Sequence, residues 1–258
     1  MKKLIFAAAA VAGMGAFALE SANVVGYSAT DYTTTGFKAY VGQFGGTDKQ
    51  DAEMTLGDIK PNAVFEWGSD ELQLLTTQGA TDSVYYYAAP ELAAENEMEA
   101  GWWLVDFGEP VEVANDVIVP FGSSVVLNIG TIGAGMVSSG EVKKGSPAIA
   151  VTQTGFNCLG NATPADCTLG DIVPNENLMW GDDELQTLAA DGSTQAVYYY
   201  AAPELAAENE MEAGWWLVDF GEPVEVANSL PIAAGEGFLL NCASSGVELN
   251  MPQVLAAE

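Results

Sequence analysis

The sequence predicts an all-β protein made of two tandem homologous domains, each a β-sandwich or barrel-like fold with one short helix. Hydrophobic residues make up 49% of the 258-residue chain and aromatic residues 10%, which is enough for a packed core. Short apolar runs recur between turns rich in Gly, Asn and Asp, at a spacing typical of β-sandwiches. An internal repeat covers most of the chain.

This repeat defines the expected domains. Residues 84–115 recur without a change at residues 197–228, at an offset of 113, and the 29 positions upstream share 16 identities. Perfect identity with abrupt edges is typical of a recent copying of one segment over the other, so it does not mark each residue in the block as functional. We expect a signal peptide at 1–18, a first β domain at 19–142, a linker at 143–145 and a second β domain at 146–258.

Strands are predicted wherever β-branched and aromatic residues lie between turn signals. Along residues 124–129, Val125, Leu127 and Ile129 alternate with other residues, which predicts one buried face. In the second domain, Phe238, Leu240 and Cys242 show the same pattern. The predicted strands of the first domain are residues 23–29, 36–44, 63–67, 71–76, 83–88, 102–107, 111–114, 124–129 and 134–142.

Residues 90–99 break the strand pattern. Pro90 suits the first turn of a helix, acidic residues and helix formers follow it, and Gly101 is placed to cap the end. We therefore predict a short surface helix between two strands. A long acidic hairpin loop is the alternative interpretation.

The first eighteen residues predict export. Lys2 and Lys3 precede an apolar run that ends in Ala16-Phe17-Ala18, a cleavage pattern typical of bacterial secretory signal peptides. The run is too short to span a bilayer comfortably, so we expect no membrane span in the mature chain. The expected location is extracellular or at the cell surface, with the periplasm as the alternative.

Charge and composition exclude several classes of function. The chain has 36 acidic residues, 7 basic residues that are all lysine, and no histidine, for a net charge of −29. Such a chain lacks the basic footprint of a nucleic-acid-binding protein. Without histidine, Ser-His-Asp and Cys-His catalysis are impossible in their usual form. Carboxylate chemistry remains, as Ca²⁺ binding or as hydrolysis by a carboxylate pair.

The tryptophans are candidate ligand-binding residues. Adjacent strand residues point to opposite faces of a sheet. Trp103 shares an apolar row with Phe107, which predicts that Trp103 and its repeat equivalent Trp216 lie in the core. Trp102 shares the other row with Asp106, so either it is half exposed and able to stack on a sugar ring, or both of its faces are covered, which is the favoured interpretation. The candidate ligand-binding residues are Trp102, Trp215, Asp106 and Asp219.

Acidic turns are candidate metal sites. Clustered carboxylates on a tight turn can ligate Ca²⁺, although neither turn matches an EF-hand loop. Simple solvation of these acids is the alternative. The candidate ligands are Asp70, Glu71, Asp182, Asp183 and Glu184.

Cysteines occur only in the second domain. Cys158 and Cys167 bracket a loop that is six residues shorter than its equivalent in the first domain, and export permits a disulfide between them. Cys242 would then be a buried free thiol. A Cys158–Cys242 bridge also remains open, because sequence cannot choose among the pairings.

Short motifs carry one resemblance. The chain contains Ala22-Asn23-Val24-Val25-Gly26-Tyr27, Gly101-Trp102 and Gly235-Glu236-Gly237-Phe238. In these segments it resembles a group of exported bacterial proteins of unassigned function whose mature chains open with an Ala-Asn-Val-Val-Gly-Tyr-like segment. The first domain departs from the last motif, with Gly122-Ser123-Ser124-Val125. The resemblance implies an exported β-rich protein and carries no catalytic residues with it.

These observations favour a protein that acts by contact. We expect a secreted or cell-surface structural or adhesive protein, not an enzyme, that works by binding or by self-assembly through aromatic side chains and strand edges. Its expected partner is a second copy or a surface glycan, and not nucleic acid. The first alternative is a carbohydrate-binding module, with Ca²⁺ as the candidate cofactor. The second alternative is a carboxylate-based hydrolase.

Overall fold

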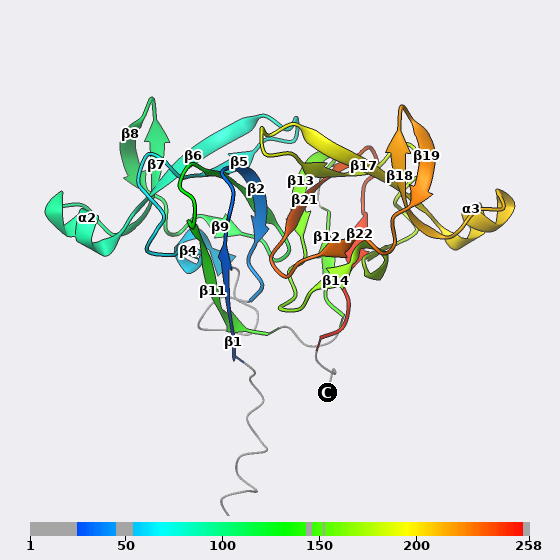
Figure 1. Ribbon diagram of the computed structural model, residues 1–258, viewed down its shortest axis with the longest axis horizontal. Coiled ribbons are helices and arrows are strands. Elements are labelled where there is room, and N and C mark those ends of the chain that lie inside the picture. Colours follow the sequence, from blue (N-terminus) through cyan, green and yellow to red (C-terminus); the bar gives the residue numbers. More distant parts are fainter. Residues whose placement is uncertain (1–24, 45–53, 143–145, 152, 255–258) are drawn as a thin grey trace, which may run out of the picture.

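A computed structural model describes residues 25–44, 54–142, 146–151 and 153–254. The described chain is mostly β and forms two similar halves that lie side by side (Figure 1). The predicted signal peptide and the predicted linker at 143–145 lie outside the described residues.

The described residues of the first half form eleven strands and two short helical segments. The strands are β1 (Val25–Asp31), β2 (Gly36–Val41), β3 (Met54–Thr55), β4 (Lys60–Pro61), β5 (Glu71–Leu75), β6 (Thr81–Ala88), β7 (Gly101–Asp106), β8 (Glu109–Val113), β9 (Ile118–Val119), β10 (Ser124–Ile129) and β11 (Gly135–Glu141). The helical segments are η1 (Leu56–Asp58) and α2 (Pro90–Glu95).

The second half repeats this order. Its strands are β12 (Ala148–Ala150), β13 (Gly155–Gly160), β14 (Cys167–Thr168), β15 (Val173–Pro174), β16 (Glu184–Leu188), β17 (Thr194–Ala201), β18 (Gly214–Asp219), β19 (Glu222–Val226), β20 (Pro231–Ile232), β21 (Gly237–Cys242) and β22 (Glu248–Asn250). Its helical segments are η2 (Leu169–Asp171) and α3 (Pro203–Glu208).

Each half is an antiparallel, sandwich-like structure. The large sheet has the order β2-β10-β5-β6-β7-β8 in the first half and β13-β21-β16-β17-β18-β19 in the second. A three-stranded sheet, β1-β11-β4 or β12-β22-β15, and a two-stranded sheet, β3-β9 or β14-β20, complete each half. The predicted all-β fold of two similar domains is therefore confirmed.

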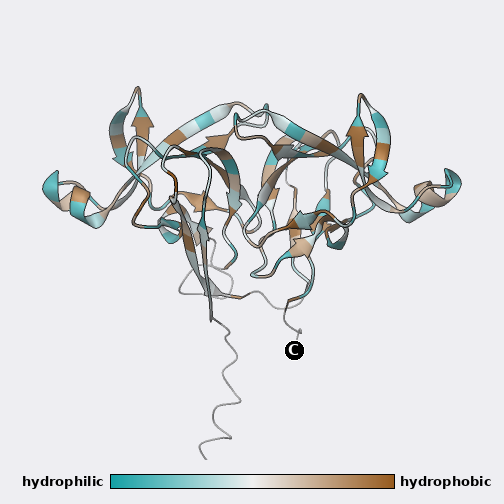
Figure 2. Ribbon diagram, in the orientation of Figure 1, coloured by the Kyte–Doolittle hydropathy of each residue, from teal (hydrophilic) through white to brown (hydrophobic). Residues whose placement is uncertain are grey.

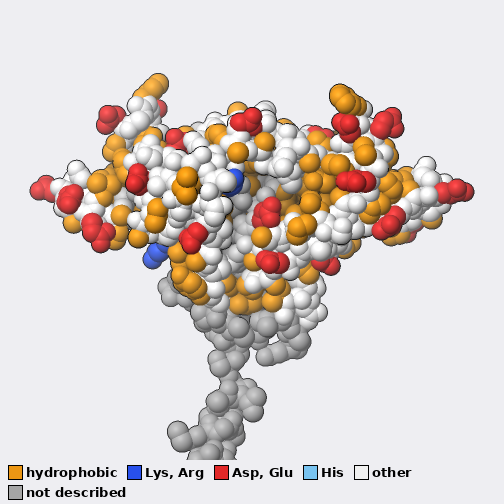
Figure 3. All heavy atoms as spheres, viewed as in Figure 1, with side chains coloured by type: hydrophobic (Ala, Val, Ile, Leu, Met, Phe, Trp, Pro, Cys, Tyr) orange, Lys and Arg blue, Asp and Glu red, His pale blue; other side chains and the backbone are white. Residues whose placement is uncertain are grey.

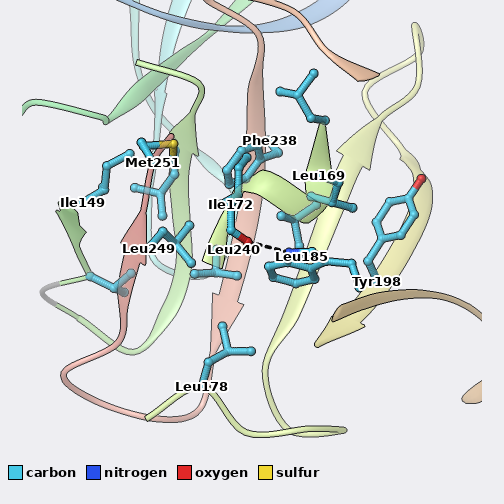
Figure 4. Packing of buried hydrophobic residues seen from close by; sticks show 14 of the residues in the cluster. Ile149, Leu169, Ile172, Leu178, Leu185, Tyr198, Phe238, Leu240, Leu249 and Met251 are labelled. Carbon is cyan, nitrogen blue, oxygen red and sulfur yellow. Dashed lines mark hydrogen bonds between the residues drawn. The ribbon is translucent and has the colours of Figure 1, made fainter. Parts of the chain in front are cut away.

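The core of each half lies beneath its large sheet. As predicted, Val125, Leu127 and Ile129 are buried together in the first half, and Phe238, Leu240 and Cys242 are buried in the second. Figure 2 shows hydrophobic and hydrophilic residues alternating along the long strands, as expected for sheets that pack on one face. Figure 4 shows the second core, where Leu185, Leu240 and Leu249 come from three different strands.

Most predicted elements of the first half are present with small shifts of their ends. Ser124–Ile129 has the predicted bounds, and the predicted helix is α2, which ends at Glu95. Gly101 does not cap it, because Gly101 begins β7. The predicted strand at 63–67 is wrong: these residues form turns, in which the Val64 N–H donates to Asn62 Oδ1 at 3.1 Å.

A pseudo-twofold interface joins the two halves through β2 and β13, which are edge strands of the large sheets. The Phe37 N–H donates to Ala190 O at 2.9 Å, and the Phe156 N–H donates to Thr77 O at 2.8 Å. Ala190 and Thr77 are equivalent in the repeat, so the same contact is made twice in opposite directions. As a result, the β7–β8 and β18–β19 hairpins project in the same direction, and α2 and α3 lie at opposite ends (Figure 1).

A second pair of contacts follows the same symmetry. The Val41 N–H donates to Gly235 O at 3.0 Å, and the Gly160 N–H donates to Gly122 O at 3.2 Å. Val41 comes from the first half but belongs to the core cluster of the second. The interface is thus continuous with a core.

Across the described residues, no helix has both the length and the apolar character needed to cross a membrane.

Candidate functional site

Phe107 and Phe220 are fully exposed at the tips of the β7–β8 and β18–β19 hairpins. In the first hairpin Asp106 pairs with Glu109, which leaves a two-residue turn of Phe107 and Gly108. Both turn residues have positive φ, 49° and 86°, as a type I′ turn requires. That turn favours Asn, Asp or Gly, and a bulky side chain at positive φ is a rare, strained choice. Turn geometry therefore does not account for the phenylalanine.

Acidic residues surround each tip. Asp106, Glu109 and Glu112 are exposed around Phe107, and the nearby Val111 is 58% exposed. Figure 3 shows the same arrangement on both sides of the molecule: each hairpin ends in a hydrophobic group with acidic side chains beside it. Each tip therefore presents an apolar side chain within a negative field. The surface that complements it is an apolar pocket whose rim is basic or donates hydrogen bonds.

Half exposure of Trp102 and Trp215 is wrong, and the favoured interpretation, in which both faces are covered, is confirmed. Both side chains are completely buried, and the Trp102 Nε1–H donates to Ile59 O at 2.7 Å, as the Trp215 Nε1–H does to Ile172 O at 2.8 Å. Neither indole has a face left for a sugar. Phe107 continues the apolar row of Trp103 and Val105 in the sequence, but it belongs to the turn, so this row does not mark the buried face of β7. Asp106 and Asp219 lie exposed beside the tips, so the structure does not bring them together with the buried tryptophans.

Trp103 and Trp216, predicted to lie in the core, are partly exposed on the outer face of the large sheets. Tyr86 is the cross-strand neighbour of Trp103, and Trp67 packs edge-to-face on Tyr86 with ring centroids 5.4 Å apart. The second half has the same patch, in which Trp180 and Tyr199 are 5.5 Å apart. We call Trp67, Tyr86 and Trp103, with their equivalents Trp180, Tyr199 and Trp216, the outer aromatic patches.

The two acidic turns hold the fold together. Asp70 is fully buried, and its carboxylate accepts N–H groups from Glu66 at 2.7 Å, Gly130 at 2.8 Å and Thr131 at 2.9 Å. In the second half, Asp183 accepts N–H groups from Met179 at 2.7 Å, Ala243 at 2.7 Å and Ser244 at 3.0 Å. The metal role predicted for Asp70 and Asp183 is therefore corrected, because their oxygens already link two loops.

The other predicted metal ligands are not brought together. Glu71 accepts a hydrogen bond from Gln73 at 2.9 Å, Glu184 accepts one from Gln186 at 2.8 Å, and Asp182 is exposed. Within the described ranges, no group of three or more His, Cys, Asp or Glu side chains could hold a metal ion.

All three cysteines are free thiols, so the predicted Cys158–Cys167 disulfide is wrong and the alternative Cys158–Cys242 bridge is not formed. Cys158 lies opposite Leu239 in the β13–β21 ladder, whereas Cys167 is in the separate β14–β20 sheet. Burial raises the pKa of each thiol from its ordinary 9.0 to about 12. These thiols are therefore protonated and poorly nucleophilic near neutral pH.

A cavity of about 470 Å³ lies between the two halves. The first half contributes Tyr32, Phe37 and Lys38, and the second contributes two segments, residues 187–198 in part and residues 230–237. Lys38 and Glu236 are the charged residues of this lining. Hydrolysis by a carboxylate pair needs two acids on opposite sides of a cleft. The acidic residue of this lining is Glu236, so the cavity lacks that arrangement.

The cavity lining contains two neutral phenol donors and two charged groups. Burial raises the pKa of Tyr32, with the nearby Tyr40 and Glu236 adding to the effect, and burial also raises the pKa of Tyr198. Both phenols therefore stay protonated at neutral pH. The Lys38 ammonium donates to Thr34 Oγ1 at 3.1 Å, and the Ala233 N–H donates to Glu236 Oε2 at 2.8 Å.

Sequence reasoning missed both the tips and the cavity. The tip could have been recognised from Gly108 and Pro110, which end the β7 pattern directly after Phe107. The cavity had a weaker signal: Ala234 stands where the first half has Phe121. Comparison of the chain with protein-family models, with curated proteins and with solved structures finds no match.

Proposed function

We propose that this is an exported, non-catalytic structural or adhesive protein of the cell surface, which holds its partner by contact through Phe107 and Phe220. The observation that carries the proposal is the state of these two side chains, which are fully exposed at the tips and held at positive φ. Such backbone strain costs on the order of 1–3 kcal/mol and points to a functional role when the fold does not need it.

A covering partner would recover that cost. Burying a phenylalanine side chain is worth about 1.5–3 kcal/mol. The pseudo-twofold interface fixes the two tips in one orientation, so a surface with two sites can engage both without ordering a linker. The arrangement therefore supports an adhesive role in which two modest contacts add up.

The proposal is tested by measuring adsorption of the protein to a methyl-terminated monolayer with a quartz-crystal microbalance. The buffer contains about 1 M NaCl, where the Debye length is about 3 Å, so that repulsion between the acidic proteins is screened. We expect Phe107→Ala or Phe220→Ala to weaken adsorption about tenfold, and the double variant about a hundredfold. The matched control is Ile132→Ala, which removes another exposed apolar side chain, 69% exposed, away from the tips. Equal adsorption by wild type and the double variant would rule the tips out.

The outer aromatic patches support a second candidate, a carbohydrate-binding module. Each offers partly exposed rings in a row across neighbouring strands, a surface on which a sugar ring can stack. Binding to a glycan array should then be lost in a Trp103→Ala/Trp216→Ala variant and kept in the Phe107→Ala/Phe220→Ala variant. An array without signal removes this candidate and leaves the adhesive proposal untouched.

A further inference from the structure

We infer that the partner of the hairpin tips is a second copy of this chain, whose cavity between the halves receives Phe107 or Phe220. This inference rests on the proposed function, because it names the occupant of the same tips. It follows from the volume and lining of the cavity, from the difference between the two halves that leaves it open, and from the match in chemistry between cavity and tip.

The cavity is open because one side chain is small. Ala234 lies in its lining, and Phe121 occupies the equivalent position in the first half. Phe121 crosses the interface and packs against the core cluster of the second half. Ala234 has only a methyl group and cannot make the reciprocal contact. The space on this side of the pseudo-twofold axis therefore suits an aromatic side chain supplied from outside.

The walls of the cavity suit a phenylalanine. Phe37, Leu188 and Ile232 contribute apolar surface, and the cavity volume of about 470 Å³ is within the range of sites that bind small organic groups. The loop that carries Ala234 and Gly235 is hydrogen-bonded to Val41 of the other half. A preformed pocket of this kind needs little rearrangement to accept a side chain.

Charge complementarity favours a tip of this chain as the occupant. Asp106 and Glu109 flank Phe107, and they would approach Lys38, one of two lysines among the described residues, and the phenol donors of Tyr32 and Tyr198. Glu236 also lies in the lining and opposes the tip, but its carboxylate already accepts the Ala233 N–H. An uncharged apolar ligand would gain nothing from the lysine.

The proposed contact is heterologous, since tip and cavity are different surfaces of one molecule. Such contacts do not close on themselves unless the rotation happens to close a ring, so they produce open assemblies. Two copies that each carry a large negative charge repel each other at low ionic strength. Self-association should therefore increase with salt, the opposite of an assembly held mainly by ion pairs.

Sedimentation velocity of the purified protein tests the inference, at about 0.1 M and about 1 M NaCl. We expect wild type and the Ile132→Ala control to sediment as monomers at low salt and as species of about twice the monomer mass or larger at high salt. Phe107→Ala/Phe220→Ala and Ala234→Phe should both stay monomeric. The repeat itself indicates that the fold accepts phenylalanine at this position, because Phe121 is its equivalent.

A second measurement protects the test against misfolding of Ala234→Phe. A benzophenone amino acid placed at position 107 of the otherwise unchanged chain should crosslink, at high salt, to peptides of a second copy that contain residues 30–39, 187–198 or 230–237. Wild type that stays monomeric at both salt concentrations, or crosslinks that fall elsewhere, would overturn the inference. If only the double tip variant loses association, the tips act as proposed and the cavity is not their partner.

Discussion

Two pairs of adjacent residues show how sharply position decides role in this protein. Trp102 is buried whereas Trp103 is partly exposed, and Asp183 is buried whereas Asp182 is exposed. Along a strand, successive side chains point to opposite faces, so an error of one residue exchanges core for surface. The sequence marked Trp102, Asp182 and Asp183 as candidates for binding and placed Trp103 in the core. Only the structure separates the residues that build the fold from those that lie at the surface.

The acidic turn of the second half offers a direct test of a structural role. Asp183→Asn replaces one acceptor oxygen with a donor that faces a backbone N–H, because Met179 N lies 2.7 Å from Oδ2 and Ala243 N lies 2.7 Å from Oδ1. We expect a loss of about 1.5–3 kcal/mol in the free energy of unfolding, measured by urea titration. Asp182→Asn, one residue earlier and exposed, should change it by less than about 0.5 kcal/mol. Equal effects would contradict the assignment.

The buried thiols predict a loss of stability in alkali. In the unfolded chain each thiol loses its proton near pH 9, whereas in the folded protein it keeps it up to a pKa of about 12. Between these two pKa values the unfolded state binds fewer protons than the folded state. The contribution of the buried thiols to the free energy of unfolding is therefore complete below about pH 9 and is lost as the pH rises towards about 12.

The urea concentration at the midpoint of unfolding should therefore decrease as the pH is raised from about 8 to about 10. In a variant with Cys158, Cys167 and Cys242 all replaced by alanine, the midpoint should change less with pH, even though it starts lower. An unchanged pH dependence in that variant would show that other groups, such as the buried tyrosines, cause the effect.

At the level of elements, the hairpins combine two conflicting demands. The type I′ turn favours a residue that tolerates positive φ, and the exposed tip carries a phenylalanine. Phe107→Asn and Phe220→Asn should therefore stabilise the fold by about 0.4–1 kcal/mol each. The same changes should reduce adsorption and self-association as strongly as alanine does.

Urea unfolding of the Asn variants measures this gain, and Gly108→Ala, at φ 86°, supplies the opposite control, with a loss of similar size. A trade of stability against activity is expected where a strained residue serves function. If both Asn variants are less stable than wild type, the phenylalanines contribute to the fold and the strain argument fails.

The edges of the two large sheets are arranged against sheet-to-sheet assembly. The edges β2 and β13 are each hydrogen-bonded to turns of the other half, and the exposed edges β8 and β19 each carry a proline and two glutamates. Proline and charge on an edge strand discourage pairing with another chain. Self-assembly through the edges of the large sheets is therefore less favoured by this arrangement than assembly through the tips.

The elements differ in how well the sequence could predict them, and for physical reasons. Ser124–Ile129 was predicted to the residue, because Val125, Leu127 and Ile129 alternate without interruption. The face of β7 was inverted, because Phe107 continues the apolar row into a turn. Cysteine pairing and the cavity could not be predicted, since both depend on how distant strands pack. Gly108 and Pro110 mark the turn in the sequence, but the positive φ and the full exposure of Phe107 come only from the structure.

On the scale of the whole molecule, the halves form one unit. Edge strands, a shared core residue and two symmetric pairs of hydrogen bonds join them. The excess of acids opposes this compactness through self-repulsion, which salt relieves. A fixed relation between the halves is what sets the two tips in one direction, and any bivalent contact depends on it.

Two glycines with the same φ can test whether local packing at the interface fixes the two halves relative to each other. At Gly192 (φ 84°) an added Cβ would lie 3.0 Å from the Phe37 ring of the other half, whereas at Gly221 (φ 84°) it would meet nothing within 4 Å. Alanine at either position carries the same backbone strain, of about 1 kcal/mol. Gly192→Ala should additionally loosen the interface, so that calorimetry resolves two unfolding transitions where wild type and Gly221→Ala show one. Identical melting of the two variants would mean that the Phe37 contact does not couple the halves.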